Sequence, residues 1–298
     1  MKEITDYGRV FDTLVAKTKE YLVSNNLKAM ILGISGGIDS TVCAAICHEV
    51  SKQTGIPLIG RSLPTSFNKK EETTAADLVG NAFCNEYKEV PISKLYCTFS
   101  EVLIGYEKTA QTDLANGNIQ ARLRMIYLYN LASIYRGLVI DTDNLTEHNL
   151  GYWTVHGDVG DFNPIGGLWK TEVFKLAEYL IIRYNINKEN DKCLAVEESF
   201  KLKPTAGLGI TNNDLEELGA ESYEQVDAIL QEILAWKSFK DPDLAFKSLE
   251  EEKLAFLDEQ QMLCYPMEVI IAIAERHFKS EFKRKRLPIT ISRYLYTR

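Results

Sequence analysis

The sequence predicts an α/β fold, a parallel sheet with helices on both faces followed by a helical C-terminal extension. Short apolar runs of strand length alternate with stretches of helical spacing through the first two thirds of the chain, which is typical of crossover units in a parallel sheet. A glycine-rich loop joins the first apolar run to the helix after it. The last third has helical spacing and many charges, and it contains no run that we expect to be a strand.

The first crossover unit occupies residues 10–51. Apolar residues at helical spacing predict an amphipathic helix over residues 10–25. The continuous apolar run at residues 29–34 (AMILGI) has the length of a buried strand. Residues 41–51 then place their apolar side chains on one helical face, so the unit is strand, tight loop and helix.

The same alternation continues through the middle of the chain. Three further strands are predicted from short apolar runs at residues 56–63, 87–92 and 138–141. Three further helices are predicted from helical spacing at residues 69–83, at residues 118–135 and from Thr171 onwards, where the threonine is a suitable N-cap.

Charge is unevenly distributed along the chain. Its 34 Lys and Arg residues and 42 Asp and Glu residues give a net charge of −8, which disfavours non-specific attraction to nucleic acid over the whole surface. Residues 276–298 carry eight basic side chains and one acidic one, so this segment is +7 and the rest of the chain is −15. One end of the chain could therefore contact a polyanion.

The sequence shows no signal peptide, membrane-spanning run or linker, and these features bear on the compartment and the number of domains. The N-terminal residues carry charges every few positions, and no run approaches the ~18 apolar residues that span a bilayer, so we expect a cytoplasmic protein without membrane contact. The six cysteines include no C-x-x-C pair, which is typical of buried thiols in a reducing compartment. No repeat or linker divides the chain, and residues 1–298 are predicted to form a single domain.

The loop Gly33–Ser40 (GISGGIDS) is the segment that points most directly to chemistry. Successive glycines permit positive φ angles, so that consecutive backbone N–H groups can converge on phosphate oxygens. The helix after the loop adds the positive end of its dipole, and Ser35 and Ser40 add hydroxyl donors. The loop is therefore predicted to bind a polyphosphate. The alternative is an ordinary glycine turn in which Asp39 and Ser40 only cap the helix.

Asp39 distinguishes this loop from a kinase-type phosphate loop, which would require a lysine that is absent here. A carboxylate beside a bound polyphosphate is repelled unless a cation lies between them. The position of Asp39 therefore predicts a Mg²⁺ cofactor.

The Gly33–Ser40 loop resembles the signature of N-type ATP pyrophosphatases, enzymes that cleave ATP between its α and β phosphates. Three further segments resemble those of NAD synthetase: Gly117–Met125 (GNIQARLRM), Asp141–Glu147 (DTDNLTE) and Gly157–Val173 (GDVGDFNPIGGLWKTEV). On these four segments the chain is identified as a member of that family.

The resemblance implies a Rossmann-like fold and assigns a role to individual residues. It implies ATP contacts for Gly33, Ser35, Gly36, Gly37, Asp39, Ser40, Thr142, Lys170 and Thr205. It implies deamido-NAD contacts for Asn118, Arg122, Asp161, Lys283 and Arg284. Asp39 and Glu147 are the implied Mg²⁺ ligands, and together with Lys170 they are the implied catalytic residues.

The implied activity is ATP-dependent amidation of deamido-NAD to NAD through an acyl adenylate, with release of AMP and pyrophosphate. Only 28 residues precede the first predicted strand, too few for the glutaminase domain of glutamine-using relatives, so ammonia is the expected nitrogen donor. The resemblance also implies a homodimer, with neither nucleic acid nor membrane as a partner.

The chain departs from the family pattern at several positions. Val155-His156 stands where ammonia-dependent members often have a substrate-contacting lysine, Asp141 replaces a glycine, and the loop before Asp161 is one residue shorter. Two other functions stay open. A tRNA-modifying ATP pyrophosphatase would suit the basic C-terminus, and a non-catalytic nucleotide-binding module would bind ATP without turnover.

Overall fold

A four-stranded parallel sheet forms the centre of the protein. The computed structural model describes residues 4–102, 110–202, 214–239, 248–259 and 264–284. The strands are β1 (Met30–Gly33), β2 (Leu58–Ser62), β3 (Glu86–Glu89) and β4 (Leu138–Ile140), in the order β3-β2-β1-β4. Met30 is aligned with Leu58 on one side and with Leu138 on the other. Since the chain leaves β1 in one direction and later returns on its other side, the sheet has a switch point between β1 and β4.

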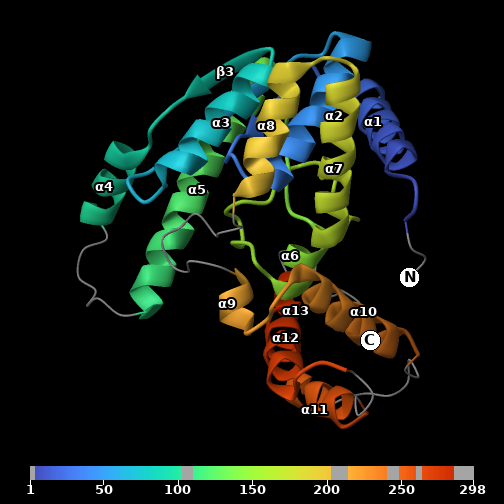
Figure 1. Ribbon diagram of the computed structural model, residues 1–298. Helices are drawn as coiled ribbons and strands as arrows, with labels where there is room; N and C mark the ends of the chain where they lie inside the picture. The colour runs from blue at the N-terminus through green and yellow to red at the C-terminus, as the bar shows by residue number, and fades with distance from the viewer. Residues whose placement is uncertain (1–3, 103–109, 203–213, 240–247, 260–263, 285–298) are drawn as a thin grey trace, which may run out of the picture.

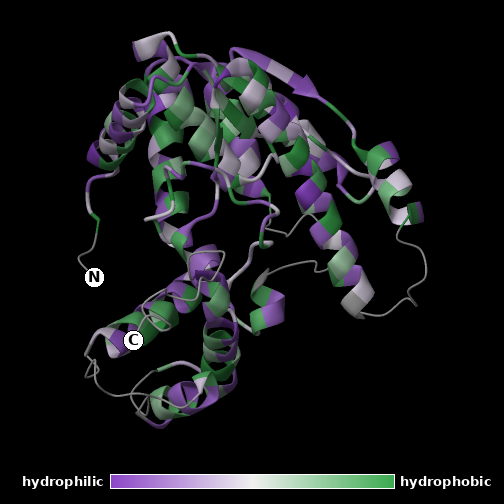
Figure 2. Cartoon of the chain, turned by 180° about the vertical axis from the view of Figure 1, so that it is seen from behind, coloured by the Kyte–Doolittle hydropathy of each residue, from purple (hydrophilic) through white to green (hydrophobic). Residues whose placement is uncertain are grey.

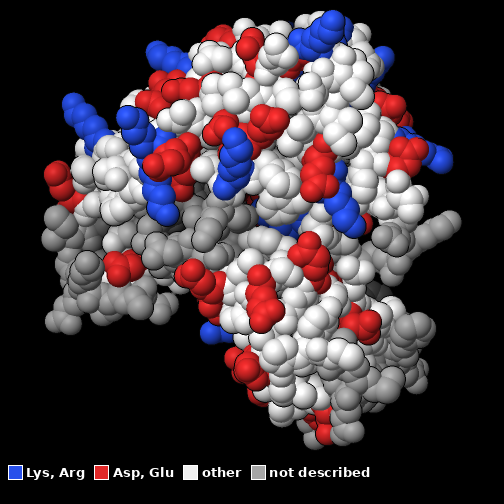
Figure 3. All heavy atoms as spheres, in the orientation of Figure 1, with Lys and Arg blue, Asp and Glu red and all other residues white. Residues whose placement is uncertain are grey.

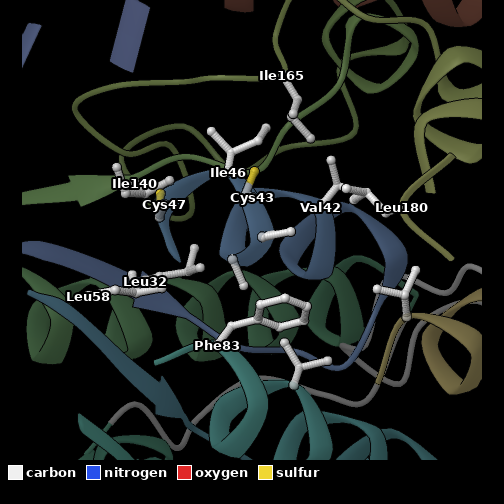
Figure 4. Close-up of a cluster of buried hydrophobic side chains, with 14 of the residues drawn as sticks. Leu32, Val42, Cys43, Ile46, Cys47, Leu58, Phe83, Ile140, Ile165 and Leu180 are labelled. Atoms are coloured by element: carbon white, nitrogen blue, oxygen red, sulfur yellow. The ribbon is translucent and has the colours of Figure 1, made fainter. Parts of the chain in front are cut away.

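Five helices cover one face of the sheet: α1 (Tyr7–Ser24), α2 (Ile38–Thr54), α3 (Lys70–Phe83), α7 (Lys170–Ile186) and α8 (Asn190–Lys201). The helix α2 lies against β1 and β2 and is buried over most of its length. Figure 4 shows Val42, Cys43 and Ile46 of α2 packed among side chains from the strands and from α3 and α7. This layer fixes the start of α2, and with it the loop before it.

The opposite face is covered by α5 (Ala110–Tyr135), with α4 (Ser93–Val102) beside it. Leu123, Leu128 and Ala132 of α5 pack on the strand residues Ile31 and Val139. This layer is thinner than the first, and both of its helices expose large apolar side chains.

The C-terminal helices form a second lobe with its own apolar core. The lobe consists of α9 (Asp214–Leu218), α10 (Tyr223–Phe239), α11 (Leu249–Glu259), α12 (Met267–Lys279) and α13 (Glu281–Arg284), packed on the short helix α6 (Leu145–Leu150). Figure 1 shows the lobe below the sheet, on the side of α6 and of the first turn of α7. It therefore faces the carboxyl ends of β1 and β4.

The α/β fold with helices on both faces and a helical C-terminal region is confirmed, and all four predicted strands are present. The third strand ends at Glu89 rather than at residue 92, although the backbone N–H groups of Val90 and Ile92 still donate to Ser62 and Pro64. Pro91 has no N–H to continue the ladder. The helices α4 and α6 were not predicted, and α5 begins at Ala110 rather than at residue 118.

Polar residues cover the outside of both parts of the molecule. Apolar residues concentrate in the helices that pack on the sheet (Figure 2). On the face shown in Figure 3, basic and acidic side chains of the described residues are interspersed over the sheet-containing part. Among the helices described here, none has both the length and the apolar character needed to cross a membrane.

His277 of α12 links the C-terminal lobe to α6. The imidazole is 1% exposed, and its Nδ1 lies 3.0 Å from the carbonyl oxygen of Asn149. Burial, together with the nearby charges of Arg284 and Lys237, lowers the pKa of His277 to about 3. The lobe therefore packs around an uncharged histidine.

This burial predicts an acid-sensitive contribution to stability. The imidazole of His277 takes up a proton near pH 6.5 in the unfolded chain but only near pH 3 in the folded chain. The contribution of neutral His277 to the free energy of unfolding is therefore complete above pH 6.5 and is lost as the pH falls towards 3. Each pH unit within this window costs about 1.4 kcal/mol. We expect His277→Gln to lower Tm at neutral pH, and the difference in Tm from the unaltered chain to shrink between about pH 7.5 and about pH 5.

The exposed His156 supplies the control, since His156→Gln changes a histidine that is not packed in the lobe. Thermal melts of the three proteins over the same pH series make the comparison. A Tm difference for His277→Gln that is independent of pH would contradict the assignment.

Candidate active site

A cavity of about 690 Å³ lies at the carboxyl ends of β1, β2 and β4. Its floor is formed by the loop after β1, and α5 contributes Asn118 and Arg124 to one wall. The C-terminal lobe contributes Arg276 and Lys283 to another wall. This is the position where open α/β sheets bind ligands, beside the switch point of the strand order.

The loop Gly33–Ser40 has the geometry of an anion-binding turn. Gly36 has a φ of +85°, and a Cβ at this position would lie 2.3 Å from the backbone oxygen of Glu72 in α3. Gly37 is the N-cap of α2, and its N–H donates to Ser35 Oγ at 3.1 Å. The Ser35 and Ser40 hydroxyls lie 3.0 Å apart. The first turn of a buried helix and two hydroxyl groups therefore border the same part of the cavity.

Lys170 lies between the two predicted metal ligands. Its Nζ is 2.5 Å from Asp39 Oδ2 and 3.2 Å from Glu147 Oε1. The lysine side chain is only 2% exposed, whereas Asp39 and Glu147 are 16% and 22% exposed towards the cavity. The structure thus brings together three residues that are more than 20 positions apart in the sequence, from α2, α6 and α7.

Asn144 fixes this arrangement from the end of β4. Its side chain accepts a hydrogen bond from Glu147 N at 3.0 Å, and Glu147 Oε2 accepts one from Asn144 N at 3.2 Å, which makes a capping box at the start of α6. Its Nδ2 also donates to Asp39 Oδ1 at 2.9 Å. Both carboxylates are therefore oriented by one residue, which sequence reasoning did not single out.

The charges in this site are strongly perturbed. Burial raises the pKa of Glu147 to about 7, against the opposing effect of the Lys170 ammonium. Burial alone would lower the pKa of Lys170, but the Asp39 and Glu147 carboxylates outweigh it and raise the pKa well above its usual value. Burial, and then the neighbouring Asp141 and Glu147, also raise the pKa of Asp143. Lys170 stays protonated, and the wall around it carries an excess of acidic groups.

This donor set fits a magnesium ion that binds together with a phosphate. Within the described part of the chain, no three Asp, Glu, His or Cys side chains converge in a ready-made metal site. Mg²⁺ is commonly held by one or two carboxylates together with substrate phosphates and water, and Asp39 and Glu147 supply two such carboxylates at the cavity. Burial and the neighbouring carboxylates disfavour negative charge on Glu147 and Asp143, which raises the pKa of both groups. A bound cation would offset this effect.

The segment between α6 and Asp158 forms the wall opposite the glycine loop. Thr154 Oγ1 donates to Asn118 Oδ1 at 2.7 Å, and Thr154 N donates to Asp158 Oδ1 at 2.6 Å. Lys283 Nζ donates to the carbonyl oxygens of Gly151, at 2.6 Å, and Trp153. Asn118 and Lys283 both line the cavity, as their predicted substrate contacts require.

Three of the predicted deamido-NAD contacts do not line the cavity, and one predicted ATP contact falls outside the described residues. Arg122 is exposed and donates from Nη2 to the carbonyl of Val155 at 3.1 Å. The two carboxylate oxygens of Asp161 accept hydrogen bonds from Tyr129 and from the backbone of Val139. Arg284 binds the carbonyl oxygens of Asn149 and His277, behind the wall, at 2.8 and 2.6 Å. Thr205 lies outside the described residues.

The cavity also contains charged residues that sequence reasoning did not single out: Arg61, Arg124, Asp158 and Arg276. Burial raises the pKa of Asp158 to about 6. Arg61 is 4% exposed, its guanidinium pairs with Glu86, and its Nε is buried without a partner. Signals for all four were present in the sequence: Arg61 lies near the end of a predicted strand, Arg124 and Asp158 lie in segments that resemble the family, and Arg276 lies in the basic C-terminal segment.

Comparison with known proteins gives one consistent result. The sequence profile described as NAD synthase matches residues 10–287. The NH(3)-dependent NAD(+) synthetase of Thermoplasma volcanium is 32% identical over 294 residues, which is 98% of this chain and 97% of that protein. Among solved structures, NMN synthetase from Francisella tularensis has a TM-score of 0.72 and 26% identity, covering 97% of this chain and all of that one. The NH3-dependent NAD synthetase from Campylobacter jejuni has a TM-score of 0.66 at 24% identity, with 97% and 100% coverage, and supports the fold alone.

The close approach of Gly36 to α3 predicts a specific effect of one methyl group. Gly36→Ala places a Cβ 2.3 Å from Glu72 O in a backbone conformation that costs alanine about 1 kcal/mol or more, so the loop must move. We expect the affinity for MgATP, measured by titration calorimetry, to fall at least about tenfold, equivalent to about 1.4 kcal/mol. Gly167→Ala is the control, because a Cβ there meets no atom within 4 Å. Equal affinities of the two variants would show that the turn does not bind ATP.

Proposed function

The chain belongs to the NAD synthase family, and on that premise we propose that it uses ATP and ammonia to amidate deamido-NAD, releasing AMP and pyrophosphate. As a member of this family it is a ligase that forms a C–N bond. The observation that carries the residue assignment is the position of Lys170. Its ammonium is buried between Asp39 and Glu147, beside the glycine turn and at the edge of a cavity.

The reaction proceeds in two steps. A carboxylate oxygen of the pyridine ring attacks the α-phosphorus of ATP, the bond from that phosphorus to the bridging oxygen breaks, and pyrophosphate leaves. The nitrogen of ammonia then attacks the acyl carbon, the bond to AMP breaks, and the amide loses a proton. Negative charge builds up on the leaving pyrophosphate, so fixed positive groups close to it lower the barrier.

This chain supplies those positive groups around the glycine turn. The first turn of α2 and the hydroxyls of Ser35 and Ser40 line this part of the cavity, and the hydroxyls would exchange their hydrogen bonds within the loop for bonds to phosphate oxygens. Lys170 adds a full charge that stays protonated, because the neighbouring carboxylates hold its pKa high. Gly33 and Thr142 line the same part of the cavity.

We assign the Mg²⁺ ligands to Asp39 and Glu147, as the sequence predicts. When bound there with the phosphates, the ion would neutralise charge on ATP and on the departing pyrophosphate. Asn144 holds one oxygen of each carboxylate in place for this role. No covalent nucleophile is needed, and the protein acts by positioning and by electrostatics.

Binding of deamido-NAD is assigned to the opposite wall. Asn118 and Lys283 face the cavity and are proposed as direct contacts. Arg122 binds the carbonyl of Val155 in the segment that forms this wall, and Arg284 binds the carbonyls of Asn149 and His277 next to it, so we assign both a supporting role within one subunit. Asp161 is proposed to support the wall through its bonds to Tyr129 and β4.

A smaller substrate is a second candidate. The NMN synthetase from Francisella tularensis covers almost all of this chain with a TM-score of 0.72. This chain also has Val155 where ammonia-dependent relatives often have a substrate-contacting lysine. Both observations favour a test of the mononucleotide, which has the same reactive carboxylate without the adenylate half.

The function is tested by direct assay of the purified protein. Incubation with ATP, Mg²⁺, ammonium and deamido-NAD is expected to yield NAD and AMP in equal amounts, whereas transfer to tRNA or simple nucleotide binding yields no NAD. A parallel reaction with nicotinate mononucleotide compares the kcat/KM of the two acceptors. Asp39→Asn should reduce turnover at least about 100-fold, since it removes a metal ligand and the partner of Lys170.

The control for that variant is Asp191→Asn, which removes an exposed carboxylate on α8 and should leave kcat unchanged. Formation of AMP without any amide product, from either acceptor, would refute the synthetase assignment. Full activity of Asp39→Asn would refute the metal site but not the reaction.

We propose that the chain is a homodimer that associates through α4 and α5. These helices cover one face of the sheet as a single thin layer, and they expose large apolar residues on their outer side. Val102, Ile126 and Ile134 are 80%, 60% and 64% exposed. Large apolar side chains exposed together on neighbouring helices are candidates for a protein interface.

A charge placed on this surface should separate the subunits. Ile126→Glu is expected to convert a dimer into a monomer in size-exclusion chromatography with light scattering, because an unpaired carboxylate would be buried in the interface. Ile182→Glu on α7 is the matched control, as it alters an isoleucine of similar exposure, 59%, on the helices of the other face. A dimer that survives Ile126→Glu but not Ile182→Glu would place the interface on the α7 side.

A further inference from the structure

Asp227 of α10 is a buried carboxylate that reaches the catalytic elements from the C-terminal lobe. Its side chain is 2% exposed. Oδ2 accepts hydrogen bonds from Thr171 N at 3.0 Å and from Thr171 Oγ1 at 2.7 Å. Oδ1 accepts one from Thr146 Oγ1 at 2.5 Å. One carboxylate thus connects α6, the first turn of α7 and α10.

Thr146 extends this connection to the backbone of Lys170. Its Oγ1 accepts a hydrogen bond from Lys170 N at 2.8 Å, so the hydroxyl proton is free to be donated to Asp227. The first N–H groups of a helix have no partner within the helix, and those of Lys170 and Thr171 are satisfied through this network. A negative charge at this end of α7 is also favourable for the helix dipole.

The two threonines are the sequence neighbours of the two catalytic residues. Thr171 follows Lys170, and Thr146 precedes Glu147. Their anchoring therefore sets where the backbone of each catalytic residue lies. Tyr223, one helical turn before Asp227 on α10, places its ring 5.6 Å from Lys170 Nζ. The same face of α10 thus contacts both the backbone and the charged end of Lys170.

We propose that Asp227 is a positioning residue, which holds Lys170 and Glu147 in place opposite Asp39 and thereby sets the affinity for ATP and the rate of turnover. The proposal rests on the phosphate-binding role assigned to Lys170 above. Displacement of a reacting group by about 1 Å costs on the order of 100-fold in rate, so a residue without substrate contact can have a large kinetic effect.

The alternative is that Asp227 only stabilises the packing of the lobe. The two roles differ in what they change. A packing residue lowers Tm but leaves the enzyme that is folded at the assay temperature with its normal kinetic constants. A positioning residue changes kcat and the affinity for MgATP, which depend on Lys170, and leaves the KM for deamido-NAD unchanged.

The first test uses Asp227→Asn, which keeps the shape of the side chain but turns one acceptor into a donor that conflicts with the Thr146 hydroxyl. We expect kcat to fall about 10- to 100-fold and MgATP affinity to fall about tenfold. The KM for deamido-NAD should stay within about twofold, because the opposite wall is untouched. Glu224→Gln removes the same charge from an exposed position one turn away on α10, and it should change none of these constants.

The second test asks whether the effect passes through Lys170. In a Lys170→Gln background, Asp227→Asn should lower MgATP affinity clearly less than tenfold, since one of the two groups that Asp227 positions is absent. The same tenfold loss in both backgrounds would overturn the proposal, as would wild-type kcat and affinity in Asp227→Asn. If Asp227→Asn does not fold, Thr171→Val removes one donor and keeps the carboxylate, with Thr171→Ser as the rescuing variant. A loss of affinity in Thr171→Val that Thr171→Ser restores supports the role, and its absence rejects it.

Calorimetric titration with MgATP separates this proposal from the proposed function. If the unaltered protein forms no amide product, the function fails, and the affinity measurements still decide whether Asp227 acts on Lys170.

Discussion

The buried ammonium of Lys170 is the constraint on which the site depends. A charge with 2% exposure is stable only when carboxylates surround it, and Asp39 and Glu147 supply them from two other helices. The same pairing keeps Lys170 charged and keeps both carboxylates at the cavity edge. Since the three residues come from α2, α6 and α7, the site exists only when these three helices are assembled at the edge of the sheet.

The order of the strands explains why these elements meet. The chain leaves β1 through the glycine turn into α2, and it leaves β4 through Asn144 into α6. β1 and β4 are neighbours, so two helices begin side by side at the same edge of the sheet. Asn144 joins the two, because it caps α6 and holds Asp39. The carboxyl ends of parallel strands converge at this edge, so the two carboxylates of the proposed magnesium site come from the helices that follow β1 and β4.

Much of this could be predicted from the sequence, because the signals are local. The apolar runs predicted the four strands, which are confirmed, and Gly36 and Gly37 predicted a tight turn at the start of α2, which the positive φ of Gly36 matches. Residues whose role depends on distant partners could not be found in this way. In the sequence, nothing distinguishes Asp227 from the other acidic residues of its helix. Its role depends on hydrogen bonds from Thr146 and Thr171, which only the folded structure brings next to it. Asp161 had a motif position like that of a substrate contact, yet its carboxylate is occupied by β4 and Tyr129.

The C-terminal helices contribute to the cavity as well as extending the fold. They bury their apolar side chains in a core of their own, and Arg276 and Lys283 also line the cavity. Lys283 and Arg284 hold the wall opposite the glycine turn by binding its backbone carbonyls. Asp227 and Tyr223 hold the lysine on the phosphate side. Because the lobe is bonded to the start of α7 through Asp227 and to the segment after α6 through Lys283, a shift of the lobe would move these two parts of the cavity relative to each other.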